Sequence, residues 1–179
     1  MPAKSGEPVG PFPPGADEVE YDKLRRRVLW KMPTGLFVVG SRSADGSRQN
    51  LMTANWVMQV SFEPKLIAVS VEKTAVTHQL IDDSRRFVVN VIDRADRAIV
   101  RKFTKPVDET FNGFPVHPAP ASGAPVLDQA LAYIDCEVRQ TVDVGGSTLF
   151  LGEVVGAGFQ KDEETEVLRM EDTLMNYGG

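Results

Sequence analysis

The sequence is poor in the residues that carry common catalytic and metal-binding chemistry. Its 179 residues include one cysteine, Cys136, and two histidines, His78 and His117. A lone cysteine cannot form an internal disulfide, and two histidines in separate segments provide too few ligands for a typical metal site. Cys136 lies in a strand-like segment, where a single cysteine is usually a small core residue. We expect both histidines at the surface or on the flank of a helix.

Further absences restrict the partners and the compartment. The chain has no GxSxG, HExxH, paired CxxC or Walker motif, no 18-residue apolar run and no charged-then-apolar leader. Its net charge of -5 argues against nucleic-acid binding, which normally needs a basic face. We therefore expect a cytoplasmic protein that binds small molecules or proteins, with no nucleic-acid or membrane partner.

The domain organisation follows from length and composition. A chain of this size with 42% hydrophobic residues fits one globular domain, which we place at 17–179. Residues 1–16 are rich in proline and glycine and predict an extended arm. A helix is expected over 18–32, ending before Pro33. Its apolar face comprises Tyr21, Leu24, Val28 and Met32.

Strands dominate the rest of the chain. TGLFVVGSR (34–42) reads as a buried strand, and Asp45-Gly46 predicts a tight hairpin turn into NLMTANWVMQVSFEP (50–64). Two long antiparallel strands are expected at 130–144 and 147–159, joined at Gly145-Gly146. Further strands are expected at 66–73 and 86–93. The order predicts a mainly β protein, an antiparallel barrel with short helices.

Two short helices and one long excursion separate these strands. The first helix, 74–84, would be capped by Thr74 and would turn Val76, Leu80 and Ile81 inward. The second is expected over 94–104. Residues 105–127 are too long for a routine connection and form a candidate lid carrying Phe111 and Phe114. Hydrophobic anchoring of the loop is the favoured role for these two rings.

Small polar residues interrupt two of the strands. Thr53, Ala54 and Asn55 offer main-chain N–H groups with little side-chain bulk, which suits close approach of a planar polar ligand. Lys73, Thr74 and Thr77 follow at a junction of strand and helix, where free N–H groups attract anions. A bulged strand, a helix cap and a solvated lysine explain the same residues equally well.

A family resemblance favours the ligand interpretation. MPTGLFVVGSR, NLMTANWVMQVSFEPKLIAVSV, EKTAVTHQLI, RRFVVNVI and LFLGEVV resemble the flavin reductase-like family over roughly residues 28–160. The resemblance implies an FMN-binding antiparallel split barrel, FMN as the cofactor with FAD as an alternative, and NAD(P)H as co-substrate. It also implies a homodimer with the flavin near the interface, which the arm 1–16 and the tail 171–179 are expected to reach.

The resemblance assigns candidate site residues. Thr53, Ala54 and Asn55 would line the pyrimidine side and ribityl chain of the flavin. Its edge would be followed by Gln59, Val60 and Ser61, and its 5′-phosphate would be held by Lys73, Thr74 and Thr77. The neighbouring residues expected to pack inward are Trp56, Val57, Met58 and Phe62.

One position departs from the family pattern. Many members carry Gly-Asp-His where this chain has Gly145, Gly146 and Ser147. Ser147 can form a hydrogen bond but cannot carry a positive charge, so nicotinamide use is less firmly implied than flavin binding. A role for Ser147 in the site and a plain tight turn are equally compatible with the sequence.

The implied reaction is hydride transfer from NAD(P)H to flavin N5, with the reduced flavin passed to a partner monooxygenase. It requires ring positioning rather than an acid, base or nucleophile, so no catalytic side chain is predicted. One alternative is a flavoredoxin-like carrier that holds FMN for electron transfer. Another is a non-enzymatic flavin- or haem-binding module. Haem is disfavoured because only His78 and His117 could ligate iron.

Overall fold

The computed structural model describes residues 7–106 and 110–177. Its helices are α1 (Glu18–Leu29) and α2 (Val76–Ser84), with 3-10 turns η1 (Arg94–Asp96), η2 (Ile99–Phe103), η3 (Phe111–Gly113) and η4 (Met170–Asp172). The strands are β1 (Phe37–Arg42), β2 (Gln49–Ala54), β3 (Val57–Phe62), β4 (Lys65–Glu72), β5 (Arg86–Val91), β6 (Val116–Pro118), β7 (Pro125–Leu127), β8 (Ala132–Asp143) and β9 (Ser147–Phe159).

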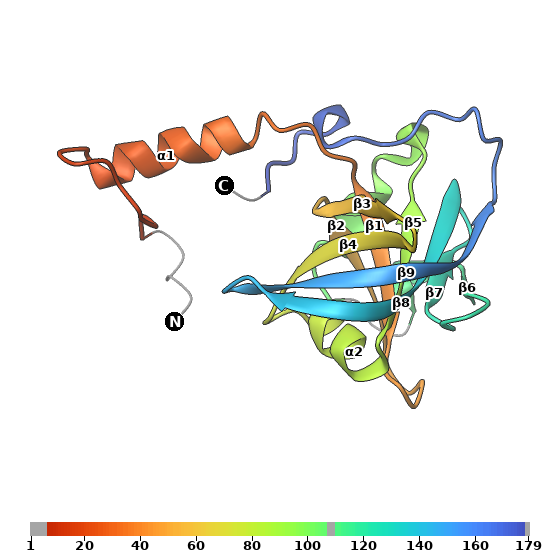
Figure 1. The fold of residues 1–179 in the computed structure, drawn as a ribbon. Coiled ribbons are helices and arrows are strands. Elements are labelled where there is room, and N and C mark those ends of the chain that lie inside the picture. Colours follow the sequence, from red (N-terminus) through yellow and green to blue (C-terminus); the bar gives the residue numbers. More distant parts are fainter. Residues whose placement is uncertain (1–6, 107–109, 178–179) are drawn as a thin grey trace.

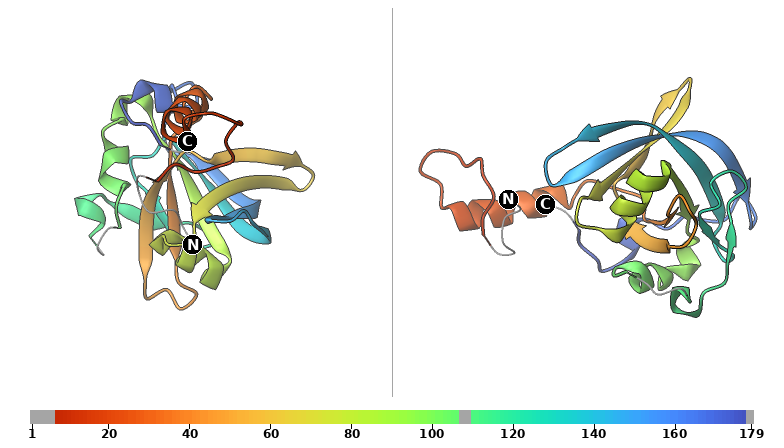
Figure 2. Two further views of the ribbon diagram at one scale, coloured as in Figure 1. Left: turned by 90° about the vertical axis from the view of Figure 1, so that its left-hand side faces the viewer. Right: turned by 90° about the horizontal axis from the view of Figure 1, so that it is seen from below.

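One antiparallel sheet forms the body of the molecule. Its strand order is β2-β1-β5-β8-β9-β4-β3, and it curls so that β2 and β3 are the two open edges (Figures 1 and 2). The long β8–β9 hairpin turns at Gly145, whose φ of +85° is accessible to glycine at little cost. The predicted fold class, a mainly β split barrel, is confirmed.

The core lies on both faces of β1. Val38 and Val39 are both fully buried, yet they belong to different hydrophobic clusters. Successive side chains of a strand point to opposite faces, so a strand covered on both sides needs a continuous apolar run. This explains the sequence of β1 and confirms the prediction of a buried strand with a hairpin turn at Asp45-Gly46.

The expected single strand over residues 50–64 is wrong. β2 pairs with β1, whereas β3 pairs with β4 at the other edge of the sheet, and the chain crosses between them at Asn55-Trp56. The inward packing expected for Met58 and Phe62 is also wrong, because these side chains are 64% and 87% exposed. Trp56 is exposed as well, and Val57 alone of the four packs against the core. An edge strand with one uncovered face leaves such residues in solvent.

Two helix predictions need correction. Residues 94–104 form η1 and η2 instead of one α-helix, although Ile99, Val100 and Phe103 are buried as an amphipathic segment requires. A 3-10 turn and an α-helix bring similarly spaced residues to one face, so the pattern did not separate them. Thr74 does not cap α2; the N-cap is Ala75, which makes no side-chain cap hydrogen bond.

Residues 105–127 form a packed excursion. β6 and β7 pair with each other, Phe111 is buried, and the ring centroid of Phe114 lies 5.5 Å from that of Phe103. Loop anchoring by the two phenylalanines is therefore confirmed. Residues 107–109 of the proposed lid lie outside the described part.

α1 projects away from the barrel (Figure 1). Leu24, Val28 and Met32 on its apolar face are exposed. The described part of the arm, 7–16, contains no helix or strand, and Phe12 packs edge-on against Tyr21 with 6.5 Å between ring centroids. Residues 1–6 of the predicted arm lie outside the described part. No described helix combines the length and apolar character needed to cross a membrane.

The cysteine is buried, and both histidines contact polar side chains. Cys136 is buried, and burial raises the pKa of its thiol to about 12, as expected for a core cysteine. His78 Nε2 lies 2.8 Å from Thr148 Oγ1, and His117 Nδ1 lies 2.7 Å from Asp128 Oδ1. Residues 7–106 and 110–177 contain no cluster of three or more candidate metal ligands.

Close packing at Gly40 provides a test of the fold. A Cβ atom added there would overlap the carbonyl oxygen of Pro125 and lie 2.6 Å from Val88 Cγ1, whereas one added at Gly146 meets no described atom within 4 Å. We expect Gly40→Ala to lower the free energy of unfolding by roughly 1–3 kcal/mol. The control Gly146→Ala should change it by less than about 0.5 kcal/mol. Urea unfolding gives the free energy of unfolding of both variants. Equal values for Gly40→Ala and Gly146→Ala would contradict the packing described.

Candidate functional site

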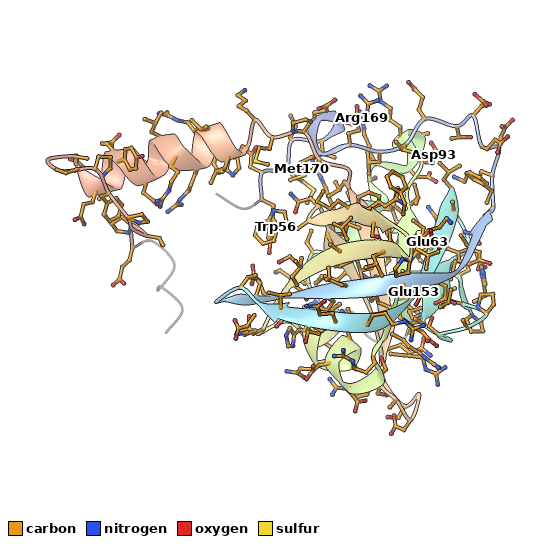
Figure 3. All side chains as sticks on the ribbon, viewed as in Figure 1. Trp56, Glu63, Asp93, Glu153, Arg169 and Met170 are labelled. Carbon is orange, nitrogen blue, oxygen red and sulfur yellow. The ribbon has the colours of Figure 1, made fainter. Side chains whose placement is uncertain are left out.

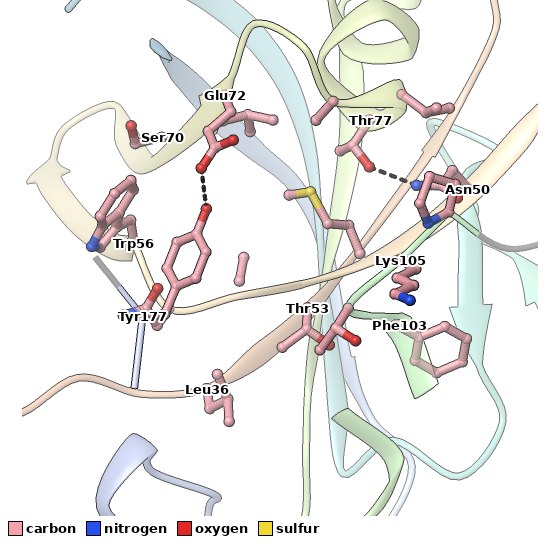
Figure 4. Close-up of a pocket in the computed structure, with 18 of the residues that line it drawn as sticks. Leu36, Asn50, Thr53, Trp56, Ser70, Glu72, Thr77, Phe103, Lys105 and Tyr177 are labelled. Carbon is pink, nitrogen blue, oxygen red and sulfur yellow. Dashed lines mark hydrogen bonds between the residues drawn. The ribbon is translucent and has the colours of Figure 1, made fainter. Parts of the chain in front are cut away.

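A cavity of about 410 Å³ lies where the split between the sheet edges meets the start of α2. Most of its lining comes from four places. These are β2 with the link to β3, the end of β4, the first turn of α2, and the chain around residues 103–106. The carboxyl-terminal segment completes the lining through Met170, Met175 and Tyr177 (Figure 4).

The link between β2 and β3 forms one wall. Thr53 and Ala54 end β2. Thr53 is half-buried, and its hydroxyl group donates a hydrogen bond to the carbonyl oxygen of Val100. Asn55 is only 7% exposed, and the carbonyl oxygen of Trp56 accepts from Ser70 N at 3.0 Å. β2 is an edge strand with a sheet partner on one side only, and Met52, Thr53 and Ala54 of this strand line the cavity.

The first turn of α2 forms a second wall. Its N-cap, Ala75, has extended backbone angles (φ -74°, ψ 143°) but no side-chain oxygen to accept from the first helical N–H groups. Thr77 is buried, and its Oγ1 accepts from Asn50 Nδ2 at 2.8 Å, which ties the helix to β2 (Figure 4). The start of the helix lines the cavity with no side-chain cap, so its positive dipole end is directed there.

Charged groups are few among the lining residues. Glu72 and Lys105 are the charged members of the described lining. The Tyr177 hydroxyl donates to Glu72 Oε1 at 2.5 Å, and burial followed by the Glu72 carboxylate raises the pKa of Tyr177. The remaining lining is largely apolar, including Leu36, Phe103 and Met52.

Half of the predicted site residues line this cavity. They are Thr53, Ala54, Asn55, Thr74 and Thr77. The other five do not. Gln59, Val60 and Ser61 lie on β3, at a bulge in its pairing with β4, and Gln59 Nε2 donates to the Ser61 carbonyl oxygen at 3.2 Å. A direct ligand role for these three stays a prediction.

Lys73 and Ser147 lie beside the cavity. Lys73 Nζ is 2.8 Å from both carboxylate oxygens of Asp143, and Lys73 N donates to the Gly146 carbonyl oxygen at 3.0 Å. The hydrogen bond from Lys73 is the main reason that the pKa of Asp143 is lowered. Ser147 pairs with Glu72, so the β8–β9 turn is tied to the end of β4. Their contact with a ligand also stays a prediction.

Sequence reasoning missed the tail. Met170, Met175 and Tyr177 line the cavity, and the last two belong to the tail 171–179, which was expected to reach a neighbouring subunit. Figure 3 shows Met170 and Trp56 at the same end of the barrel, beside the tail. Isolated apolar residues in a polar segment carry no periodic signal, so the sequence did not reveal this wall of the cavity.

Comparisons with known proteins agree on one family. The model of the flavin reductase like domain matches residues 29–179. The NADH-dependent FAD reductase of Streptomyces globisporus is 34% identical over 136 residues, which cover 74% of this chain and 73% of that protein. A diflavin flavoprotein of Nostoc sp. is 34% identical over 137 residues, but this chain covers only 23% of its length.

Solved structures give the same result. The NADH:FAD oxidoreductase SgcE6 of Streptomyces globisporus, in complex with NAD and FAD fragments, is 31% identical with a TM-score of 0.75, covering 86% of this chain and 90% of that chain. BorF, the flavin reductase component of a bacterial two-component tryptophan halogenase, is 27% identical with a TM-score of 0.72, covering 82% and 92%. By sequence and by fold, this chain belongs to the flavin reductase-like domain family.

Proposed function

We propose that this protein binds a flavin in the cavity between β2, β4 and α2 and reduces it with NAD(P)H. The observation that carries the proposal is the meeting of an open strand edge with a helix start that lacks a side-chain cap. Membership of the flavin reductase-like domain family supports the same ligand.

The residues present fit a flavin. The cavity volume of about 410 Å³ lies within the range of small-molecule sites, and its lining is mostly apolar with a few polar groups, as a flat ring requires. Thr53 to Asn55 offer main-chain groups and an amide for the polar rim of the ring. The first turn of α2, with Thr74 and Thr77, offers N–H groups for a phosphate.

The chain's contribution to the reaction is positioning. When bound, the flavin accepts a hydride from the nicotinamide, which is chemistry of the two cofactors. The apolar side chains around the cavity exclude water, and N–H groups near Asn55 stabilise negative charge on the pyrimidine side of the ring. No side chain has to give up or take a proton for this, which agrees with the absence of a predicted catalytic residue.

The chain takes FMN or FAD, and NADH is the first donor to test. Both flavins share the ring, the ribityl chain and the first phosphate, and the polar features of the cavity address these shared parts. The relative from Streptomyces globisporus is an NADH-dependent FAD reductase, which supports NADH and extends the flavin choice beyond FMN. The reduced flavin would be passed to a partner monooxygenase, and the similarity to BorF, the flavin reductase component of a two-component tryptophan halogenase, supports a partner enzyme.

A nucleotide oxidation assay tests the function. Purified protein should oxidise NADH or NADPH only when FMN or FAD is added, and under anaerobic conditions the flavin absorbance should bleach. Failure to bind either flavin would remove the proposal. Flavin binding without oxidation of either nucleotide would instead support the alternative of an FMN-holding electron carrier.

The phosphate end of the site can be tested at Ala75. An aspartate there would cap α2 and repel a phosphate, so Ala75→Asp should weaken FMN binding roughly tenfold. Its stability should be unchanged or raised by about 1 kcal/mol. Ala75→Ser supplies a neutral cap as the control, and riboflavin, which lacks the phosphate, should bind both variants equally. Calorimetric titration gives the affinities, and wild-type FMN affinity in Ala75→Asp would refute this assignment.

We also propose a homodimer formed through the apolar surface of β3. Met58, Val60 and Phe62 are exposed there, and an exposed apolar edge strand of this kind marks an interaction surface. A symmetric pairing would cover it and bring the edge with Gln59 and Ser61 to the interface. The arm 1–16 would extend this contact.

Sedimentation velocity tests the dimer. Phe62→Ser removes a ring that is 87% exposed, so the monomer should keep its fold. The dissociation constant of the dimer should rise at least tenfold. Val144→Ser, at the exposed β8–β9 turn, is the control and should leave the dimer intact. A wild-type protein that sediments as a monomer would contradict the proposal.

A further inference from the structure

The carboxyl-terminal segment returns to the barrel and runs along the cavity. Leu168 N donates to the Ile92 carbonyl oxygen at 2.8 Å, and Met170 N donates to the Thr34 carbonyl oxygen at 3.0 Å. Beyond this anchored part, Thr173 makes local bonds, accepting from Met175 N and donating to the Met170 carbonyl oxygen. Asp172 Oδ1 forms an ion pair with Arg94 Nε at 2.9 Å, so the anchored part extends to Asp172. The residues after Thr173 are held to the barrel mainly by their side chains.

Tyr177 joins two walls of the cavity. Its hydroxyl donates to Glu72 at the end of β4, and its ring centroid lies 5.2 Å from that of Trp56 in the β2–β3 link (Figure 4). A hydrogen bond to a carboxylate is stronger than one between neutral groups. A tyrosine hydroxyl is protonated at neutral pH and can donate there, and the raised pKa of Tyr177 extends this to more alkaline pH.

Tyr177 also separates two cavities. A second cavity of about 170 Å³ lies on its other side, lined among others by Trp30, Met32 and Met175. The two spaces share part of their lining, and the shared residues form the wall between them: Asn55, Trp56, Met170, Met175 and Tyr177. The Tyr177 side chain is about half exposed, which places it at the mouth rather than in the core. Its displacement would open the flavin cavity toward solvent and toward the second space.

We propose that Tyr177 is a latch, held on Glu72, that controls how fast the flavin enters and leaves the cavity. This rests on the proposed flavin binding and extends it to the release step. A closed latch retains the flavin, and an open latch lets reduced flavin leave for a partner enzyme. Tyr177 would act as a gating residue and not as a participant in hydride transfer.

The latch itself can be tested without any flavin. The chain has two tryptophans, so a Trp30→Phe background leaves Trp56 as the single reporter. In ligand-free protein, adding Tyr177→Phe should raise the acrylamide quenching constant of Trp56, because loss of the hydroxyl frees the ring that packs on the indole. Tyr133→Phe, a half-buried tyrosine that lines neither cavity, should leave it unchanged. Equal quenching constants in the Trp30→Phe protein with and without Tyr177→Phe would overturn the latch.

The rate of flavin release tests the functional consequence of the latch. FMN-loaded protein is diluted in a stopped-flow instrument, and the recovery of Trp56 fluorescence gives the dissociation rate. Tyr177→Phe should raise this rate about tenfold or more, as expected for loss of a hydrogen bond to a charged group. Glu72→Gln leaves a weaker neutral acceptor and should raise it less.

The double variant decides between a latch and two separate effects. Glu72→Gln should add nothing to Tyr177→Phe, because the shared bond is already lost. Wild-type release rates in both single variants, or effects that multiply in the double variant, would overturn the proposal. If the quenching result holds but the wild type does not bind FMN, Tyr177 still closes the cavity wall, whereas flavin binding and the control of flavin release both fail.

Discussion

The site depends on how the sheet is left open. β2 and β3 follow each other in the chain but lie at opposite edges of one antiparallel sheet, so the link at Asn55-Trp56 has to cross the gap between them. Residues in such a crossing cannot all pair within the sheet, and their main-chain groups need other partners. A ligand with donors and acceptors around its rim can supply them. The same opening that interrupts the barrel therefore creates the cavity.

The electrostatic potential at the site depends on the groups beside it rather than on the net charge of the whole chain. The net charge of -5 is unfavourable for a phosphorylated ligand, yet the first turn of α2 presents N–H groups beside Thr74 and Thr77. The effect of a helix end is confined to its first turn, so a remote acidic surface does not cancel it in water and salt. Lys73 contributes less than its charge suggests, since Asp143 already holds its ammonium group.

Much of the barrel was predictable from local patterns, because buried strands and tight turns leave local signals. The apolar run of β1, the Asp45-Gly46 turn and the long β8–β9 hairpin are examples. The break at Asn55-Trp56 was not predictable in this way, since both strands around it have strand-like sequences and only the pairing partner differs. The exposure of Phe62 was missed for a related reason. Its apolar character indicates burial, but it does not tell whether the same chain or another molecule buries the side chain. Of the cavity lining, the polar residues of β2 and of the start of α2 were singled out from the sequence, and the family resemblance assigned them to a flavin, whereas the tail was not recognised.

The tail shows how a site can depend on residues with no pattern of their own. Met170 and Met175 pack against the core cluster around Leu36, whereas Tyr177 reaches the cavity through its hydrogen bond to Glu72 and its ring contact with Trp56. Segments joined by few contacts open at lower free energy than core strands such as β1 and β5. The wall that they form is consequently the part of the cavity that can open while the sheet stays intact. A reductase that must release its flavin to another enzyme needs such a wall, and a carrier that keeps its flavin does not.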